Sequence, residues 1–252
     1  MPILQQLIEN DEIRLIGFAG GKGRGHLINA LASELAHNGK KVVLTNIEKD
    51  ILPPSGLIIF QKDQNKLLKQ IEREIKENPI IYAGSELEDH FVTGVDSTMI
   101  EKLSESRHID FLFLIMGNSK SVSFLSLNEI SEITKYERIQ QLVYCFQFDM
   151  IDQVLGGQDL SEVSQVLNHF AEFKPDKAIS YELMLKYFTD AAHGSYKLFQ
   201  QKWPAHLILT DINNLLLENR CINFARDLQT YQINHIWQAN LKENMIKRIS
   251  SR

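Results

Sequence analysis

Residues 17–25 read G-F-A-G-G-K-G-R-G, and this stretch decides the fold of the chain. It lies between an apolar, strand-like run at 13–16 and a helix-like run at 27–36. Glycines let a backbone approach an anion closely, and the N–H groups of a helix N-terminus then point at that anion. A glycine-rich turn from a strand into a helix, carrying a lysine, is therefore typical of a phosphate-binding loop.

The loop departs from the standard phosphate-loop motif, G-x-x-x-x-G-K-[ST]. If Gly21 and Lys22 form the G-K pair, Gly23 replaces the Ser or Thr whose hydroxyl normally ligates magnesium. If Gly23 and Arg24 form the pair, Gly25 stands at that position instead. Both registers keep the backbone cradle and lose the magnesium hydroxyl, so we expect phosphate binding with a poorly held magnesium ion.

Seven residues form the candidate phosphate-binding set. Lys22 is expected to be the dominant cation and Arg24 the secondary one, because the register with Lys22 keeps Gly17 at the end of the strand. The set is Gly17, Gly20, Gly21, Lys22, Gly23, Arg24 and Gly25.

The composition of the chain argues against several classes of protein. The 252 residues carry a formal net charge of -5 and no long basic run, so nucleic acid is not expected as a partner. No apolar run is long enough to span a membrane, and the N-terminus has no signal-peptide pattern, which predicts a cytoplasmic protein. Cys145 and Cys221 are far apart, and no histidines share helical metal-ligand spacing, so no disulfide or zinc site is expected.

Strand and helix patterns alternate along most of the chain, which predicts parallel β-α-β units covered on both faces. The expected fold is a three-layer α/β fold of the phosphate-loop NTPase type with a mainly parallel sheet. Helices are expected at 64–77 and 97–104, and a further helix runs through Asp227. Strands are expected at 41–46, 57–60, 80–83, 111–116, 142–148, 206–210 and 232–238.

Consecutive helix patterns at 161–173, 180–188 and 193–201 interrupt this alternation. We interpret them as an inserted helical subdomain. The expected division is 1–158 for the first part of the phosphate-loop core, 159–203 for the helical insertion, and 204–252 for the second part of the core.

Several segments occur in an order found in one known family. After the glycine loop come G-K-K-V at 39–42 and T-N-I-E-K at 45–49. A-G-S-E-L at 83–87 and T-G-V-D at 93–96 follow, and I-S-Y-E-L-M-L-K-Y occurs at 179–187. Over most of its length the chain resembles the YqeC family, the accessory proteins of selenium-dependent molybdenum hydroxylases.

The resemblance implies a protein that assists maturation or insertion of the selenium-containing cofactor. It implies ATP or GTP as the bound nucleotide, and a molybdenum hydroxylase or its maturation proteins as partners. The family signature E-A-D-G-S-K-G falls on 115–121, where Ile115 and Gly117 replace both carboxylates. The family also has a segment that resembles the base-recognition motif of guanine-nucleotide proteins. That segment falls on T-D-I-N at 210–213, where little of the motif remains. The resemblance therefore implies a divergent member, and it leaves open whether the chain is an enzyme.

Four charged residues near the expected loop are further candidates. Glu48 and Asp50 follow the second strand and either hold a metal ion or are solvated loop charges. Lys49 and Lys120 are candidates for phosphate contacts.

Two other functions remain open at this point. One is a non-catalytic nucleotide-binding or scaffold protein that docks a partner enzyme. The other is an enzyme of the same fold that is similar to dethiobiotin synthase or to a molybdopterin-guanine-dinucleotide accessory enzyme, although such enzymes need an intact G-K-[ST] sequence.

Overall fold

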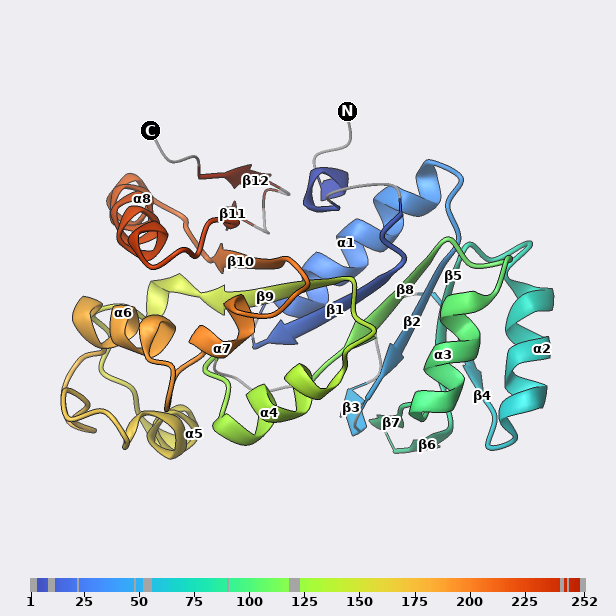
Figure 1. Cartoon of the computed structure of the whole chain (residues 1–252), viewed down its shortest axis with the longest axis horizontal. Helices are drawn as coiled ribbons and strands as arrows, with labels where there is room; N and C mark the ends of the chain where they lie inside the picture. Colours follow the sequence, from blue (N-terminus) through green and yellow to red (C-terminus); the bar gives the residue numbers. More distant parts are fainter. Residues whose placement is uncertain are drawn as a thin grey trace. The chain divides into compact units, whose positions relative to one another are not determined.

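The computed structural model describes residues 4–8, 12–21, 23–47, 49–51, 56–89, 91–117, 123–240, 243 and 245–249. Within these residues, nine strands form one large sheet and three short strands form another (Figure 1). In spatial order, the large sheet consists of β12 (Met245–Arg248), β11 (Ile236–Asn240), β10 (Ala205–Thr210), β9 (Gln141–Gln147), β1 (Leu15–Gly20), β8 (Phe111–Ile115), β2 (Val42–Asn46), β5 (Ile80–Gly84) and β4 (Leu57–Phe60).

The large sheet is mainly parallel and is flanked by helices, so the predicted three-layer α/β fold is confirmed. β1 and β2 each pair in parallel with β8, and β5 pairs in parallel with both β2 and β4. β11 pairs in parallel with β10 and antiparallel with β12. The helices are α1 (Arg24–His37), α2 (Gln64–Glu74), α3 (Ser97–Glu105), α4 (Leu127–Lys135), α5 (Gly157–Leu167), α6 (Tyr181–Thr189), α7 (Tyr196–Phe199) and α8 (Leu215–Thr230).

The described chain divides into two compact units, which are considered separately. The first unit comprises residues 1–19, 25–119 and 138–142. The second comprises residues 20–24, 120–137 and 143–252. This division groups the expected helical insertion at 159–203 with β10, β11 and β12.

Helix ends in the first unit follow local sequence signals. Asp63 caps α2 by accepting hydrogen bonds from the N–H groups of Asn65 and Lys66. At the C-terminal end of α1, Gly39 adopts φ +76° and its N–H donates to the carbonyl of Ala36, as in a Schellman motif. Gly39 thus terminates α1. Figure 1 shows α2 and α3 side by side next to the strands that they cover.

The second unit packs its helices around a cluster of buried aromatic rings. The rings of Phe146 and Phe188 have centroids 4.9 Å apart, and Phe188 also contacts Phe224 of α8. Ser126 and Glu129 form a capping box at the start of α4, which fixes where that helix begins.

Four of the expected elements differ clearly from the structure. Strand β1 continues four residues past the expected end at Ile16, because it remains paired with β8 and its residues are buried. Helix α5 begins at Gly157 instead of Ser161 and ends at Leu167 instead of Phe173. The helix expected at 193–201 is the single turn α7, and β11 begins at Ile236 instead of Gln232.

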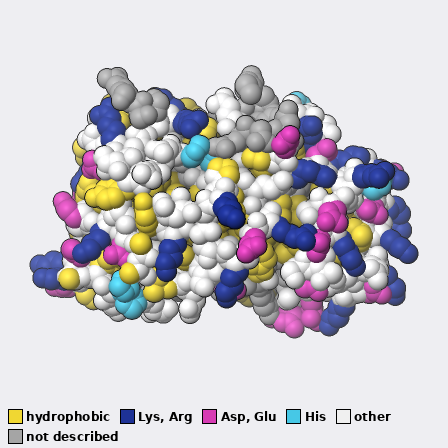
Figure 2. All heavy atoms as spheres, in the orientation of Figure 1, with side chains coloured by type: hydrophobic (Ala, Val, Ile, Leu, Met, Phe, Trp, Pro, Cys, Tyr) yellow, Lys and Arg dark blue, Asp and Glu magenta, His cyan; other side chains and the backbone are white. Residues whose placement is uncertain are grey.

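The surface carries mixed charge. Figure 2 shows acidic and basic side chains intermixed on the visible face, with apolar side chains between them. Among the described helices, none combines the length and the apolar character needed to cross a membrane. Among the described residues, the large apolar side chains that are exposed are Leu87, Phe91, Val154, Leu215, Leu216, Tyr231 and Met245.

Candidate phosphate-binding turn

The turn between β1 and α1 is shorter than the sequence pattern indicates. Strand β1 ends at Gly20 and α1 begins at Arg24, so only residues 21–23 connect the two elements. The N–H of Arg24 donates to the carbonyl of Gly21 at 3.2 Å, which closes the turn directly before the helix. Lys22 lies outside the described residues.

Gly17 is not at the strand end, and this expectation is wrong. It pairs with Leu114 inside the sheet, and an added Cβ atom would lie 2.7 Å from the sulfur of Met116. Its small size therefore allows the sheet to pack, and it lies inside the strand instead of in the turn. The glycine that ends β1 is Gly20.

Gly20 and Gly23 adopt a backbone conformation that favours glycine. Their φ angles are +97° and +94°, in the region that side chains with a Cβ atom rarely occupy. At Gly20 an added Cβ atom would also lie 2.0 Å from the carbonyl oxygen of Cys145. Two of the predicted loop glycines are thus required by the turn itself.

Helix α1 begins in a way that suits an anion. The first N–H groups of an α-helix have no partner within the helix, and the helix dipole is positive at this end. The 14-residue α1 has no acidic residue in its first turn. Gly25 follows Arg24 in this first turn, and apart from its chain neighbours and the backbone of the helix, no atom lies within 4 Å of the position that its Cβ atom would take.

Arg24, the expected secondary cation, does not face solvent. Its side chain is buried, with 4% of its surface exposed. Burial raises the pKa of the Cys145 thiol to about 12, while the positive charge of Arg24 opposes this rise. Burial shields the Arg24 side chain from solvent, so Lys22 stays the predicted phosphate cation.

The turn follows the carboxyl end of β1, the end of a strand at which α/β proteins usually bind ligands.

The end of β2 has a packing role that no pattern in the sequence indicates. Asn46 is buried, its side-chain amide donates to the carbonyl of Val92 at 3.3 Å, and it accepts a hydrogen bond from the hydroxyl of Tyr82. An added Cβ atom on Gly94 would lie 1.8 Å from the carbonyl oxygen of Asn46. Close packing therefore explains the glycine of the T-G-V-D segment.

The aspartate of the same segment begins a helix. Asp96 accepts a hydrogen bond from the N–H of Met99 at 2.9 Å and so caps α3. This hydrogen bond is the main cause that holds the pKa of Asp96 below its usual value. A capping residue of this kind is readable from sequence, because an Asp directly precedes the helical pattern.

The four additional charged candidates have different placements. Glu48 and Lys120 lie outside the described residues. Lys49 and Asp50 belong to β3 (Lys49–Ile51), whose backbone pairs antiparallel with β7 (Phe91–Thr93). With β6 (Glu86–Glu88) these strands form the small three-stranded sheet. Contacts of these four side chains with phosphate or metal remain predictions.

The end of β8 lacks the acidic groups of the family signature. Ile115 is the last residue of the strand, and Gly117 follows with φ +76°. Asp110 precedes the strand at its other end, where its carboxylate accepts a hydrogen bond from the N–H of Lys41 at 2.7 Å. Asp110 therefore stabilises the amino end of the sheet.

A buried hydroxyl network holds the segment that leads into α4. The hydroxyl of Tyr187 accepts a hydrogen bond from the N–H of Leu125 at 2.8 Å and lies 3.0 Å from the hydroxyl of Tyr144. Tyr144 in turn donates to the carbonyl of Ser123 at 2.7 Å. Burial raises the pKa of both tyrosines, so both stay neutral hydroxyls.

Residues 210–213, where the family has its base-recognition segment, form the turn after β10. Thr210 ends β10, and Asp211 follows with φ +62°. Asn214 then caps α8 by accepting a hydrogen bond from the N–H of Leu217 at 2.9 Å. These contacts explain the polar residues between β10 and α8 without a ligand.

The comparisons with known proteins gave no match: no family model matches the chain, and neither curated proteins nor solved structures show similarity to it. The resemblance to the YqeC family therefore stays a prediction from the sequence segments. In the part of the chain that the structure describes, no three His, Cys, Asp or Glu residues form a group that suits a metal ion.

Proposed function

We propose that the chain binds a nucleoside triphosphate, ATP or GTP, with its phosphates at the turn between β1 and α1. The observation that carries this proposal is the pair of left-handed glycines, Gly20 and Gly23, directly before a long helix without acidic residues in its first turn. Backbone N–H groups and the helix dipole suffice to bind an anion at such a turn.

The proposed biological role is that of an accessory protein in the maturation of selenium-dependent molybdenum hydroxylases. This role rests on the order of the sequence segments, and the α/β fold is compatible with it. A fold of this type hosts many functions, so the partner enzyme has to be tested directly.

Replacing Lys22 by alanine is expected to weaken nucleotide binding about ten-fold or more, the scale of a lost charge-assisted hydrogen bond. Titration calorimetry with ATP and GTP, with and without magnesium, measures the effect. Lys40→Ala is the matched control, because Lys40 is an exposed lysine beyond the other end of α1. Equal losses in the two variants, or a larger loss in a folded Arg24→Ala variant, would contradict the assignment.

Hydrolysis by the isolated chain is expected to be very slow. Phosphoryl transfer relies on magnesium and on a positioned water molecule. In this chain a glycine occupies the hydroxyl position of the loop in either register, and Ile115 and Gly117 replace the strand-end carboxylates. A phosphate-release assay checks this: turnover of about 1 per second, an ordinary enzyme rate, that is lost in Lys22→Ala would contradict it.

A non-catalytic scaffold that docks a partner enzyme is the alternative function. The exposed side chains of Leu215 and Leu216, 77% and 70% exposed at the start of α8, favour it. Binding of the partner hydroxylase with and without nucleotide distinguishes the two functions. A scaffold would bind its partner hydroxylase equally well with and without nucleotide, and Lys22→Ala would leave that binding unchanged.

A further inference from the structure

A hollow in the second unit lies at the amino ends of two neighbouring strands. It has a volume of about 300 Å³ and is formed by the segment before β10 and the segment before β11. These ends are adjacent because the two strands pair in parallel, and the N–H of Leu207 donates to the carbonyl of His235 at 2.9 Å. Among the residues that line the hollow are Phe199, Lys202, Trp203, Gln232, Asn234 and His235.

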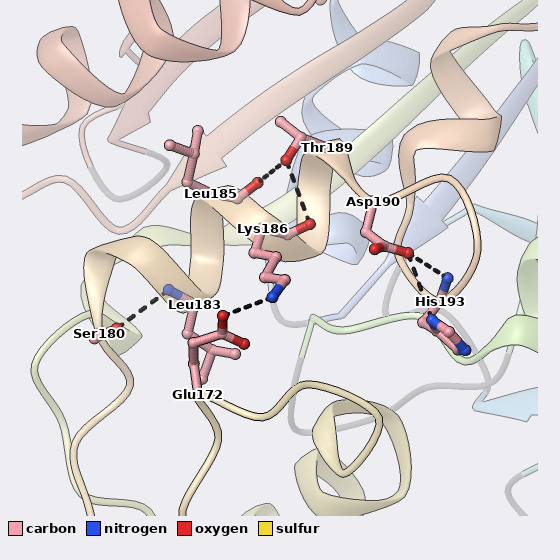
Figure 3. A network of polar contacts seen from close by, with 8 residues as sticks. All are labelled: Glu172, Ser180, Leu183, Leu185, Lys186, Thr189, Asp190 and His193. Carbon is pink, nitrogen blue, oxygen red and sulfur yellow. Dashed lines mark hydrogen bonds and ion pairs between the residues drawn. The ribbon is translucent and has the colours of Figure 1, made fainter.

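The charges at this hollow favour an anion. Lys202 and His235 line it, and among its described lining residues none is acidic. Lys202 is exposed and makes no ion pair within the described part of the chain. Lys186 of the same unit differs, because Glu172 holds it at 2.6 Å (Figure 3). The positive charge of Lys202 is therefore available to a ligand.

A stack of rings fixes the orientation of His235. Its ring centroid lies 4.9 Å from that of His206, whose ring in turn lies nearly parallel to Trp237. The indole N–H of Trp237 donates to Nδ1 of His206 at 3.1 Å, which anchors the stack. Nδ1 of His235 lies 3.4 Å from Nη2 of Arg248. Because a guanidinium only donates, this Nδ1 accepts, and the ring of His235 carries its proton on Nε2 as a hydrogen-bond donor.

The end of α8 does not oppose an anion in this hollow. A helix C-terminus repels anions through its unpaired carbonyl groups. Here the carbonyl of Leu228 accepts hydrogen bonds from the N–H groups of Tyr231 at 3.0 Å and Ile233 at 3.3 Å, so it is satisfied within the chain. The side-chain amides of Gln232 and Asn234 add neutral donors to the lining.

Two aromatic rings give the hollow an apolar wall. Phe199 and Trp203 both line it, and only 8% of the surface of Trp203 is exposed, so this ring is packed in place. Aromatic rings favour offset-stacked or edge-to-face contacts with other rings. A volume of about 300 Å³ is at the lower end of the range for ligand pockets. The hollow therefore suits a ligand with a single ring.

We infer that this hollow binds a small aromatic carboxylate. Lys202 and Nε2–H of His235 donate to the carboxylate, and the rings of Phe199 and Trp203 contact the aromatic part of the ligand. A carboxylate fits better than a phosphate group, because Lys202 is the one fully charged cation among the described lining residues. This site is separate from the proposed nucleotide site, which follows the carboxyl end of β1.

Amide NMR titration of the full chain with sodium benzoate tests the inference. The expected result is saturable shifts at the amides of residues 201–203 and 232–235, with about millimolar affinity because the ligand has few atoms. Lys202→Met keeps the length of the side chain and removes its charge, and it is expected to weaken binding about ten-fold or more. Lys202→Arg keeps the charge and is expected to retain binding. Lys177→Met is the matched control, because Lys177 is an exposed lysine of the same unit outside the hollow.

Two other ligands separate the carboxylate from its parts. Benzyl alcohol keeps the ring without the charge and is expected to bind about ten-fold more weakly or worse. Inorganic phosphate is expected to give no saturable shifts at these amides. Equal affinity for benzyl alcohol and benzoate, tighter binding of phosphate, or equal losses in Lys202→Met and Lys177→Met would overturn the inference. An absence of saturable shifts well above millimolar benzoate would also overturn it. Lys22→Ala is expected to bind benzoate normally, so failure here is distinct from failure of the nucleotide proposal.

Discussion

Replacing Gly20 by alanine is expected to destabilise the folded chain by about 3 kcal/mol or more, since left-handed strain and overpacking each cost about 1–3 kcal/mol. The φ angle of Gly20 is +97°, and a Cβ atom there would lie 2.0 Å from the carbonyl oxygen of Cys145. That oxygen belongs to the backbone of a buried strand, so it has little freedom to move. Urea unfolding followed by circular dichroism measures the loss.

Gly25→Ala is the matched control from the same glycine-rich stretch. Gly25 lies in α1, where the added Cβ atom would meet nothing within 4 Å except its chain neighbours and the backbone of the helix itself. Alanine in a helix is more stable than glycine by roughly 0.5–1 kcal/mol, so this variant is expected to be as stable as the original chain or slightly more stable. Equal stability of the Gly20 and Gly25 variants would show that β1 does not end as described.

Replacing Tyr187 by phenylalanine is expected to cost about 1–3 kcal/mol of stability, the penalty for leaving buried polar groups without partners. The change removes the hydroxyl that accepts the N–H of Leu125 and that hydrogen-bonds to Tyr144. All three residues are buried, so water cannot easily replace the lost oxygen. The free energy of unfolding in urea gives the magnitude.

Tyr196→Phe provides the comparison for this second effect. The hydroxyl of Tyr196 makes one hydrogen bond at the surface, to the carbonyl of Tyr231 at 3.2 Å. Surface substitutions usually change stability by less than about 0.5 kcal/mol, and a small change is expected. If Tyr187→Phe were as mild as Tyr196→Phe, the buried network would not hold the segment before α4.

Short apolar runs in the sequence were sufficient to predict most strands of the large sheet. The strand expected at 57–60 agrees with β4, and those expected at 80–83 and 111–116 agree with β5 and β8 to within one residue. These strands are short apolar runs, a pattern typical of strands buried in a parallel sheet. The β1 end was missed because glycines interrupt the apolar pattern, although pairing with β8 continues past Gly17.

Long-range contacts account for the other differences. The helix expected at 193–201 is only one turn, and at its expected start Gly194 lies so close to Tyr187 that an added Cβ atom would be 2.0 Å from the Tyr187 carbonyl oxygen. Nothing in the local sequence reveals that contact. The stacking of the His169 and His193 rings depends in the same way on how α5, α6 and α7 fold back, and no helical spacing of histidines signals it.

Several residues of the family-like segments have roles in the fold of this chain. Asn46 and Gly94 pack against each other, and Asp96 caps a helix, so these positions serve the fold. The glycines of the turn are different, because Gly20 and Gly23 shape the backbone directly before α1. The functional proposal therefore rests on residues 20–25.

The most direct test of the nucleotide proposal is an amide NMR titration of the full chain with a non-hydrolysable ATP or GTP analogue. The account predicts saturable shifts at the backbone amides of Gly21, Gly23, Arg24 and Gly25, and their loss in Lys22→Ala. An absence of shifts at these amides with millimolar nucleotide, or saturable shifts confined to other parts of the chain, would contradict it.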